Sequence, residues 1–280
     1  MTRFWQRLCV TVSSFAATTT LVAVAAPVAA DPVAVAGPAV WVSARAEFDT
    51  TVERTVRFTL DATTGPETPE AEIASYDVRV ARTPMSSSRR AAWRYPARLQ
   101  IHEVRAGGGD GERRQLRLGV ARGRVLCVSA RATDTLGNVG AWSNDSCVTR
   151  FLHERRLIHH GDVRRVRDDR YWGGAGARIG GGGSLVLRSV PQGSRVVVLW
   201  AEERDWATSG TGTVTGVGDR GPRRLCSGPF GGWSEKNPDY RRRDRCSKRQ
   251  GRHGPVRVHA RWDPPTAPVQ GLAIVPAWVR

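Results

Sequence analysis

The sequence predicts an all-β fold of two tandem antiparallel β-sandwiches that follow an N-terminal signal peptide. Short runs of alternating apolar and polar residues predict strands, because successive side chains in a strand point to opposite faces. Clusters of Gly, Pro, Asp and Ser between these runs predict turns. No stretch repeats its apolar residues with a helical period, and about 250 residues after the signal favour two domains. We place the domains at residues 41–150 and 151–280, after a short linker at residues 31–40.

The N-terminus has the three parts of a secretory signal. Arg3 and Arg7 give a positive start, residues 8–26 carry no charge, and small residues precede Asp31. The alternative is a permanent membrane anchor, which the many threonines and alanines of the stretch disfavour. We therefore expect a secreted or cell-surface protein that loses residues 1–30 and has no membrane span afterwards.

Alternation is clearest in the first domain. The apolar residues of four runs are Val56, Phe58 and Leu60; Tyr76, Val78 and Val80; Leu116 and Leu118; and Leu126, Val128, Ala130 and Ala132. Each run is expected to bury this face in a core. Before residue 55 the chain is crowded with charges, and the pattern locates no first strand there.

A turn motif near the end of this domain is the most specific feature. Residues 131–134 read Arg-Ala-Thr-Asp, residues 137–138 read Gly-Asn, and residues 140–143 read Gly-Ala-Trp-Ser. Residues 124–148 resemble the F strand, FG turn and G strand of a fibronectin type III domain, in the form found in exported bacterial proteins of the actinobacterial type. Residues 76–79 and Trp93 resemble the region of its strand C. The family is a scaffold and spacer, which implies a fold and no activity.

The side chains of this motif suit a tight turn. We expect Gly137 and Asn138 to adopt positive φ, and Asp134 to accept hydrogen bonds from turn amides. Trp142 is expected to pack over the end of the sheet.

The second domain also has strand-like runs separated by Gly, Pro and Asp. They are Ser184 to Arg188, Arg195 to Trp200, Thr211 to Val217, Val256 to Ala260 and Gly271 to Val275. Their order, with Tyr171-Trp172 before a glycine-rich stretch, resembles a jelly-roll-like sandwich of exported bacterial proteins that sometimes binds carbohydrate. Trp200 is expected in the core and Trp233 at the surface.

Four cysteines remain after the signal, which suggests two disulfides in an oxidising compartment. Cys127 and Cys147 lie symmetrically about Gly137, so a hairpin centred there would place them opposite each other. Cys226 and Cys246 are paired on locality and equal spacing. The histidines do not fall at zinc-finger spacing, which disfavours a zinc site.

The chain is strongly basic. Its formal charge is +17, and removing Arg3 and Arg7 leaves +15, nearly all of it arginine. This charge favours contact with anionic polymers, and the alternative is a charged surface with no dedicated partner. The candidate site is the run from Asp239 to His253, interpreted as a loop tethered by Cys226 and Cys246. The residues expected to bind polymer are Tyr240, Arg241, Arg242, Arg243, Arg245, Arg249, Arg252 and Trp233.

Other chemistries lack their motifs. The glycines of residues 173–183 precede no Gly-Lys-Ser/Thr and are expected in loops and at strand edges. His153, His159, His160 and Asp162 are expected at the surface, without a metal. Glu202, Glu203 and Asp205 are interpreted as solvated acids, and no Gly-x-Ser-x-Gly elbow occurs. We therefore expect no enzyme, cofactor or metal.

Together these features predict a monomeric, non-catalytic binding or adhesion module that contacts anionic or saccharide polymers of the cell surface. No specific nucleic acid is expected. One alternative is a structural spacer without a ligand, and another is a divergent hydrolase in the second domain.

Overall fold

The computed structural model describes residues 37–46, 49–64, 71–92, 94–100, 114–201, 212–228, 241–260 and 268–279. The predicted signal peptide, Trp93, Trp233 and Tyr240 lie outside these residues. Residues Val35–Arg280 form one compact unit. In the described part of the chain, no helix has the length and apolar character that a membrane span requires.

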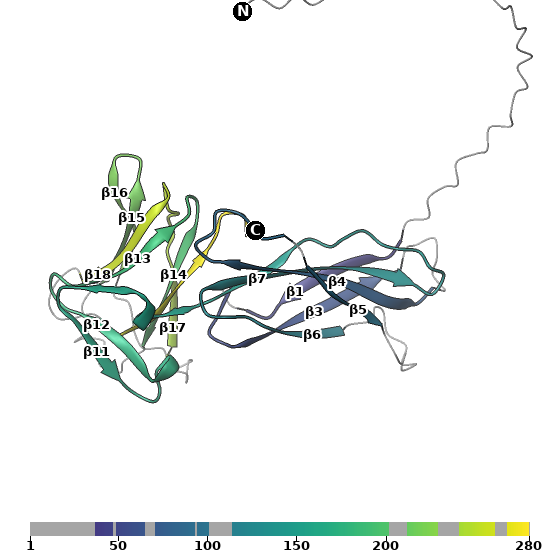
Figure 1. Cartoon of the computed structure of the whole chain (residues 1–280), viewed down its shortest axis with the longest axis horizontal. Coiled ribbons are helices and arrows are strands. Elements are labelled where there is room, and N and C mark those ends of the chain that lie inside the picture. Colours follow the sequence, from purple (N-terminus) through teal and green to yellow (C-terminus); the bar gives the residue numbers. More distant parts are fainter. Residues whose placement is uncertain are drawn as a thin grey trace, which may run out of the picture. The chain divides into compact units, whose positions relative to one another are not determined.

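Two sheets build the first sandwich (Figure 1). One has three strands in the order β1-β3-β6, and the other has five in the order β2-β8-β7-β4-β5. All neighbours are antiparallel except β2 and β8. The strands are β1 (Ala39–Ala44), β2 (Thr50–Thr51), β3 (Thr55–Thr63), β4 (Ile73–Pro84), β5 (Arg94–Gln100), β6 (Arg114–Gly119), β7 (Arg124–Asp134) and β8 (Ser146–Arg150).

The predicted alternation is confirmed in the core of this sandwich. Phe58 and Leu60 are fully buried, whereas Arg57 between Val56 and Phe58 is exposed. Tyr76 of β4 joins the same apolar cluster from the facing sheet. The first strand, which the pattern did not locate, is β1; it begins at Ala39, inside the predicted linker.

The β7–β8 connection has the expected turn chemistry. Cys127 lies directly opposite Cys147, and the two form a disulfide. Gly137 has a φ of 87°, and Asp134 accepts hydrogen bonds from the amides of Leu136 (3.0 Å) and Asn138 (2.8 Å). Asn138 does not have positive φ, so glycine alone takes the left-handed conformation of this turn.

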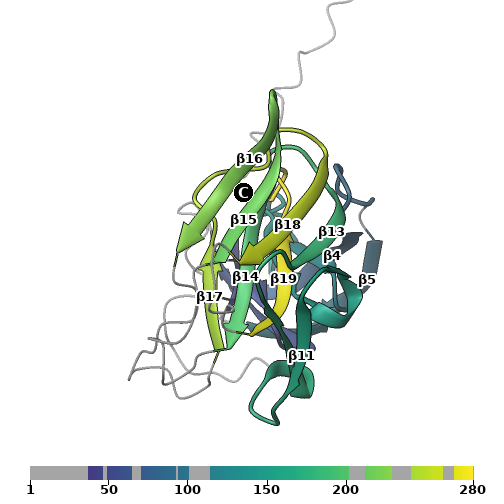
Figure 2. The ribbon, with the colours of Figure 1, turned by 90° about the vertical axis from the view of Figure 1, so that its left-hand side faces the viewer.

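Two further sheets build the second sandwich. One has the order β10-β13-β18-β15-β16; the other has the order β11-β12-β19-β14-β17, with β9 also pairing with β19. Figure 2 shows β16, β15, β18 and β13 side by side. The strands are β9 (Leu152–His153), β10 (Ile158–His160), β11 (Val163–Arg167), β12 (Ala175–Ile179), β13 (Ser184–Val190), β14 (Arg195–Ala201), β15 (Gly212–Gly218), β16 (Gly221–Gly228), β17 (Arg241–Arg245), β18 (Gly254–Ala260) and β19 (Val269–Val275). Two 3-10 turns, η1 (Glu154–Arg156) and η2 (Trp172–Gly174), connect strands of this sandwich.

The five strand candidates of the second domain correspond to β13, β14, β15, β18 and β19. Residues of β14 and β19 are buried on both faces, which explains their continuous apolar sequences. Trp200 of β14 is fully buried, as predicted. The pattern missed β9 to β12, β16 and β17, which are short or rich in arginine and glycine.

The second disulfide links the two sheets at their edges. Cys226 lies in β16, an edge strand of the five-stranded sheet. Cys246 follows β17 directly, and β17 is an edge strand of the other sheet. Residues Arg241–Arg245 form β17, which pairs with β14. The sequence analysis placed these residues in a tethered loop, and that part of the prediction is wrong.

Candidate functional site

A tight hairpin between β15 and β16 forms one side of the candidate site. Gly218 pairs with Gly221, so that Asp219 and Arg220 form the turn. Gly221 has a φ of 118°, a conformation open to glycine and strained for other residues. The hairpin carries Arg223 and Arg224 on its returning strand, where both are exposed.

Residues 246–252, which we call the basic segment, form the other side. Backbone hydrogen bonds hold the segment to the hairpin: Lys248 N–H donates to the carbonyl of Leu225 (3.3 Å), and the N–H groups of Gly251 and Arg252 donate to the carbonyl of Val217 (3.1 and 3.0 Å). The basic segment is thus irregular in conformation and yet fixed in place.

Gln250 fastens the basic segment from inside. Its side chain is 1% exposed; Oε1 accepts a hydrogen bond from Val217 N–H (3.1 Å) and Nε2 donates to the carbonyl of Gly254 (3.4 Å). A side chain at Gly216 would collide with Oε1, so a larger residue at this position would displace the Gln250 side chain. The Gln250 backbone N–H also donates to the carbonyl of Ser194 (2.8 Å).

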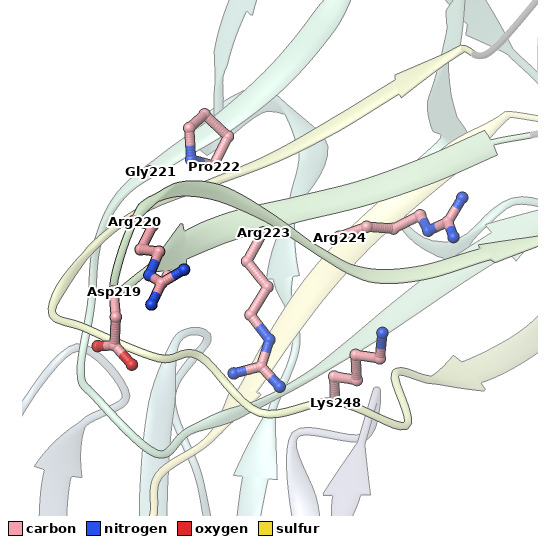
Figure 3. Close-up of a pocket in the computed structure, with 8 residues that line it drawn as sticks. Asp219, Arg220, Gly221, Pro222, Arg223, Arg224 and Lys248 are labelled. Carbon is pink, nitrogen blue, oxygen red and sulfur yellow. The ribbon is translucent and has the colours of Figure 1, made fainter.

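Between the hairpin and the basic segment lies an open hollow of about 650 Å³, which we call the cationic hollow. It is lined by Gly218, Asp219, Arg220, Gly221, Pro222, Arg223, Arg224 and Lys248. Figure 3 shows the guanidinium groups of Arg220 and Arg223 and the ammonium group of Lys248 around the hollow, whereas Arg224 extends away from them.

The hollow carries an excess of positive charge. The one acidic residue that lines the hollow is Asp219, which accepts a hydrogen bond from Nε of Arg252 at 3.2 Å. The positive charge of Arg252 therefore balances the negative charge of Asp219. Within the described residues, Arg220, Arg223, Arg224 and Lys248 form no ion pair with a carboxylate. Cations that are fixed close together without counter-charges attract anions.

The structure brings part of the predicted site to this place. Arg252 pairs with the turn, and Arg249 donates from Nη1 to the carbonyl of Gly193 (3.0 Å). Arg245 is exposed on β17, and Arg243 is half-buried. The side chains of Arg241 and Arg242 are not described, and Trp233 and Tyr240 lie outside the described residues. A role in polymer binding stays a prediction for all eight residues.

Arg220, Arg223 and Arg224 were missed by the sequence analysis. A signal for them existed: the predicted strand ending at Val217 runs into Gly-Asp-Arg-Gly, a sequence that favours a hairpin turn. The following Pro-Arg-Arg would then have been assigned to the returning strand.

One histidine expected at the surface is instead buried. His153 is 1% exposed, and its Nε2 donates to the carbonyl of Trp172 (3.0 Å), a tautomer assigned from this geometry. Burial lowers the pKa of His153 to about 4. The adjacent Glu154 is also buried, which raises its pKa, with Arg165 Nε 3.3 Å from Oε1. These groups belong to the interior and not to a binding surface.

The remaining candidates are the acids of the second domain and the metal ligands. The acids at residues 202, 203 and 205 lie outside the described residues. Across the described stretches, no three His, Cys, Asp or Glu side chains are grouped so that they could hold a metal ion.

No protein-family model matches the chain, and neither does any curated protein sequence. Among solved structures, a family 35 carbohydrate-binding module from Clostridium thermocellum has 18% identity and a TM-score of 0.33, over 45% of this chain and 97% of that one. The tandem CBM22 domains of Paenibacillus barcinonensis Xyn10C have 9% identity and a TM-score of 0.31, over 85% and 91%.

An exo-β-1,3-galactanase from Phanerochaete chrysosporium has 10% identity and a TM-score of 0.35, over 78% of this chain and 54% of that one. The TM-scores of these three structures lie below 0.5. The function of this chain is therefore inferred from its own geometry.

Proposed function

We propose that this chain is an exported, non-catalytic binding protein that holds an anionic polymer in the cationic hollow. The observation that supports this most directly is the set of cations Arg220, Arg223 and Lys248, held around one hollow and lacking carboxylate partners among the described residues. Arginine binds carboxylate, sulfate and phosphate with two parallel hydrogen bonds, and lysine adds a point charge.

Prior fixation of the backbone that carries Lys248 favours binding. The basic segment is held by five backbone hydrogen bonds to its neighbours, formed by Cys246, Lys248, Gln250, Gly251 and Arg252 as donors. Less conformational freedom is then lost when a ligand binds, and preorganisation of this kind raises affinity.

A polymer fits the hollow better than a small anion does. The hollow is open to solvent, where one ion pair contributes only about 0.2–1 kcal/mol. A repeating anion can engage several cations together and continue along Arg224, Arg249 and Arg252 outside the centre of the hollow.

Export is supported by the two disulfides, which fit an extracellular protein. The strand orders β1-β3-β6 and β8-β7-β4-β5 support the finer assignment of the first sandwich to the fibronectin type III type. The two packed antiparallel sheets of the second domain support the jelly-roll-like assignment.

The test is elution from dextran sulfate beads in a rising NaCl gradient. The triple variant Arg220→Ala/Arg223→Ala/Lys248→Ala is expected to elute at clearly lower salt, with affinity reduced roughly tenfold by the loss of three exposed ion pairs. The matched control is Arg124→Ala/Arg156→Ala/Arg188→Ala, which removes the same charge from exposed positions outside the hollow.

Equal elution of the two triple variants would show that binding follows net charge and not this site. No saturable binding by the unaltered chain would favour a structural spacer instead.

A further inference from the structure

The outer face of the sheet β1-β3-β6 carries three rows of side chains that run across its strands. Register places Trp41 opposite Asp61 in the first row. Ser43, Thr59 and Gln115 make up the second row. Arg45, Arg57 and Arg117 make up the third, because Arg45 N–H continues the ladder by donating to the carbonyl of Arg57 (3.1 Å). We call these eight residues the Trp41 face.

Trp41 is unusually exposed for so large an apolar side chain. Its exposed fraction is 56%, whereas Val40 beside it in β1 is buried on the core side of the sheet. Among the described residues, neither a second ring nor a guanidinium group stacks on its indole. A flat aromatic surface is thus presented to solvent, where it is available to a partner.

The middle row offers hydrogen bonds in a line. Ser43 and Gln115 are exposed and Thr59 is half-buried between them. Side chains directly opposite each other on neighbouring strands have Cβ atoms about 4.5–5.5 Å apart. Two hydroxyls and one amide therefore present both donors and acceptors at regular spacing across the sheet.

The third row places like charges side by side. Arg57 lies directly opposite Arg117, and both are exposed. Directly opposed like charges destabilise a sheet. In the described part of the chain, no carboxylate pairs with Arg45, Arg57 or Arg117. An anion bound between these guanidinium groups would remove the repulsion and gain two-point hydrogen bonds.

We propose that the Trp41 face is a second binding surface, which takes an acidic oligosaccharide with carboxylates on its sugar rings. One sugar ring stacks on the Trp41 indole beside the carboxylate of Asp61. The hydroxyls of the following ring bond to Ser43, Thr59 and Gln115, and a sugar carboxylate meets the three arginines. The rows of Trp41 and Arg45 are four residues apart, or about 13 Å along a strand, so that a short oligosaccharide spans them.

This surface is separate from the cationic hollow, which belongs to the β15–β16 hairpin and the basic segment. The proposal therefore does not depend on the proposed function. It differs in kind as well, because an aromatic platform binds a sugar ring whether or not the sugar is charged.

The test is calorimetric titration of the full chain with a short oligogalacturonate and with its methyl ester, which has the same rings without the charge. Trp41→Ala is expected to weaken binding of both ligands about tenfold or more. Arg57→Gln/Arg117→Gln is expected to weaken binding of the acid several-fold and leave the ester unchanged. Leu136→Ala, at another exposed apolar residue, and Arg124→Gln/Arg188→Gln serve as matched controls and are expected to bind normally.

The hollow variant Arg220→Ala/Arg223→Ala/Lys248→Ala is expected to keep its affinity for both ligands. Loss of oligogalacturonate binding in that variant would place the ligand in the hollow and overturn the proposal. Undiminished binding of both ligands by Trp41→Ala would overturn it too.

Discussion

The two sandwiches differ in how their sheets are held together. In the first, the disulfide joins Cys127 and Cys147, which already face each other on paired strands of one sheet. In the second, the disulfide joins an edge strand of one sheet to the end of an edge strand of the other. Both bonds span 20 residues of sequence. Two cysteine pairs with the same sequence separation therefore have different structural roles. The first disulfide joins strands that hydrogen bonds already pair, whereas the second joins two different sheets.

The buried side chains of Asp134, Gln250 and Gln270 also differ in what they connect. In the first sandwich, Asp134 binds the amides of its own turn. In the second, Gln250 connects the basic segment to β15, and Gln270 of β19 donates to the carbonyl of Trp200 in β14 (3.0 Å) while its Oε1 accepts from Trp172 N–H. In the second sandwich the cationic hollow is thus adjacent to a segment held by one such side-chain link, that of Gln250.

Removal of each disulfide gives the largest expected effect. Cys127→Ala/Cys147→Ala and Cys226→Ala/Cys246→Ala should each lower the free energy of unfolding by about 3 kcal/mol, since the closed loops are of equal length. The two variants should differ in function: loss of the link between the sheets frees the basic segment and weakens binding to dextran sulfate, whereas loss of the first disulfide leaves binding intact.

Urea unfolding and the elution assay measure the two quantities. Equal retention of both variants on the beads would contradict this difference, because it would show that the Cys226–Cys246 disulfide does not position the hollow.

Gln250→Ala tests the side-chain link without touching a covalent bond. It leaves Val217 N–H and the carbonyl of Gly254 without their partner, and a buried group left unpaired costs about 1–3 kcal/mol. We expect lower stability together with weaker binding. Ser247→Ala, an exposed position in the same segment, is the control and should change neither. Destabilisation with normal binding would confine the role of Gln250 to the core.

Alternation predicted most of the first sandwich because strands such as β3 bury one face, although β7 is buried on both faces around Cys127 and Ser129. Val56, Phe58 and Leu60 are typical, with Arg57 on the solvent side. The exception is β1, where Trp41 and Ser43 lie outside and the apolar signal is reduced to Val40 and Val42. The charges that follow β1 obscured this strand, and its outward-facing Trp41 is the residue that makes its face a candidate binding surface.

The second sandwich was predicted at β13, β14, β15, β18 and β19, which carry an apolar signal, and that signal is most continuous in β14 and β19. Pairing of β17 with β14 could not be foreseen from an Arg-Arg-Arg-Asp-Arg sequence, because a charged edge strand has no buried face to produce a pattern. Assembly of the hollow from residues 218–224 and Lys248 likewise depends on tertiary contacts, the backbone hydrogen bonds that join the basic segment to the hairpin. Sequence reasoning found the cations of the basic segment and missed those of the hairpin.

We expect the two sandwiches to differ in how their stability depends on pH. His153 is held neutral with its pKa lowered to about 4, mainly by burial, and Arg155, Arg122 and Arg165 act in the same direction. The unfolded chain then binds the extra proton at higher pH, so stability falls as the pH drops from about 6.5 to about 4. The raised pKa of Glu154 has the opposite sign, because the folded state takes up that proton first.

The measurement is the midpoint temperature of unfolding between pH 7 and pH 4.5. Between these pH values the unaltered chain should lose about 5–10 °C more than His153→Gln, with the exposed His160→Gln as control. In the first sandwich, burial raises the pKa of Asp134 but the hydrogen bonds from Asn138, Leu136 and Gly137 outweigh it and hold the pKa below its usual range. The stability that Asp134 provides is therefore lost only at lower pH. An identical pH profile for His153→Gln and the unaltered chain would contradict this assignment.

Trp142→Ala gives the smallest expected effect and tests whether the first sandwich also depends on side-chain links. The guanidinium groups of Arg79 and Arg131, from β4 and β7, lie 4.4 and 4.9 Å from the Trp142 ring, and Arg131 also pairs with Asp77 at 3.0 Å. Cation–π contacts at exposed sites contribute about 0.5–1 kcal/mol, so loss of the ring should cost about 1 kcal/mol in urea unfolding. Trp142→Phe should recover part of this, because a phenyl face still attracts the cations. A cost as large as that of Gln250→Ala would show that both sandwiches rely on specific side-chain links, whereas no cost would leave backbone pairing and core burial as the whole source of stability in the first.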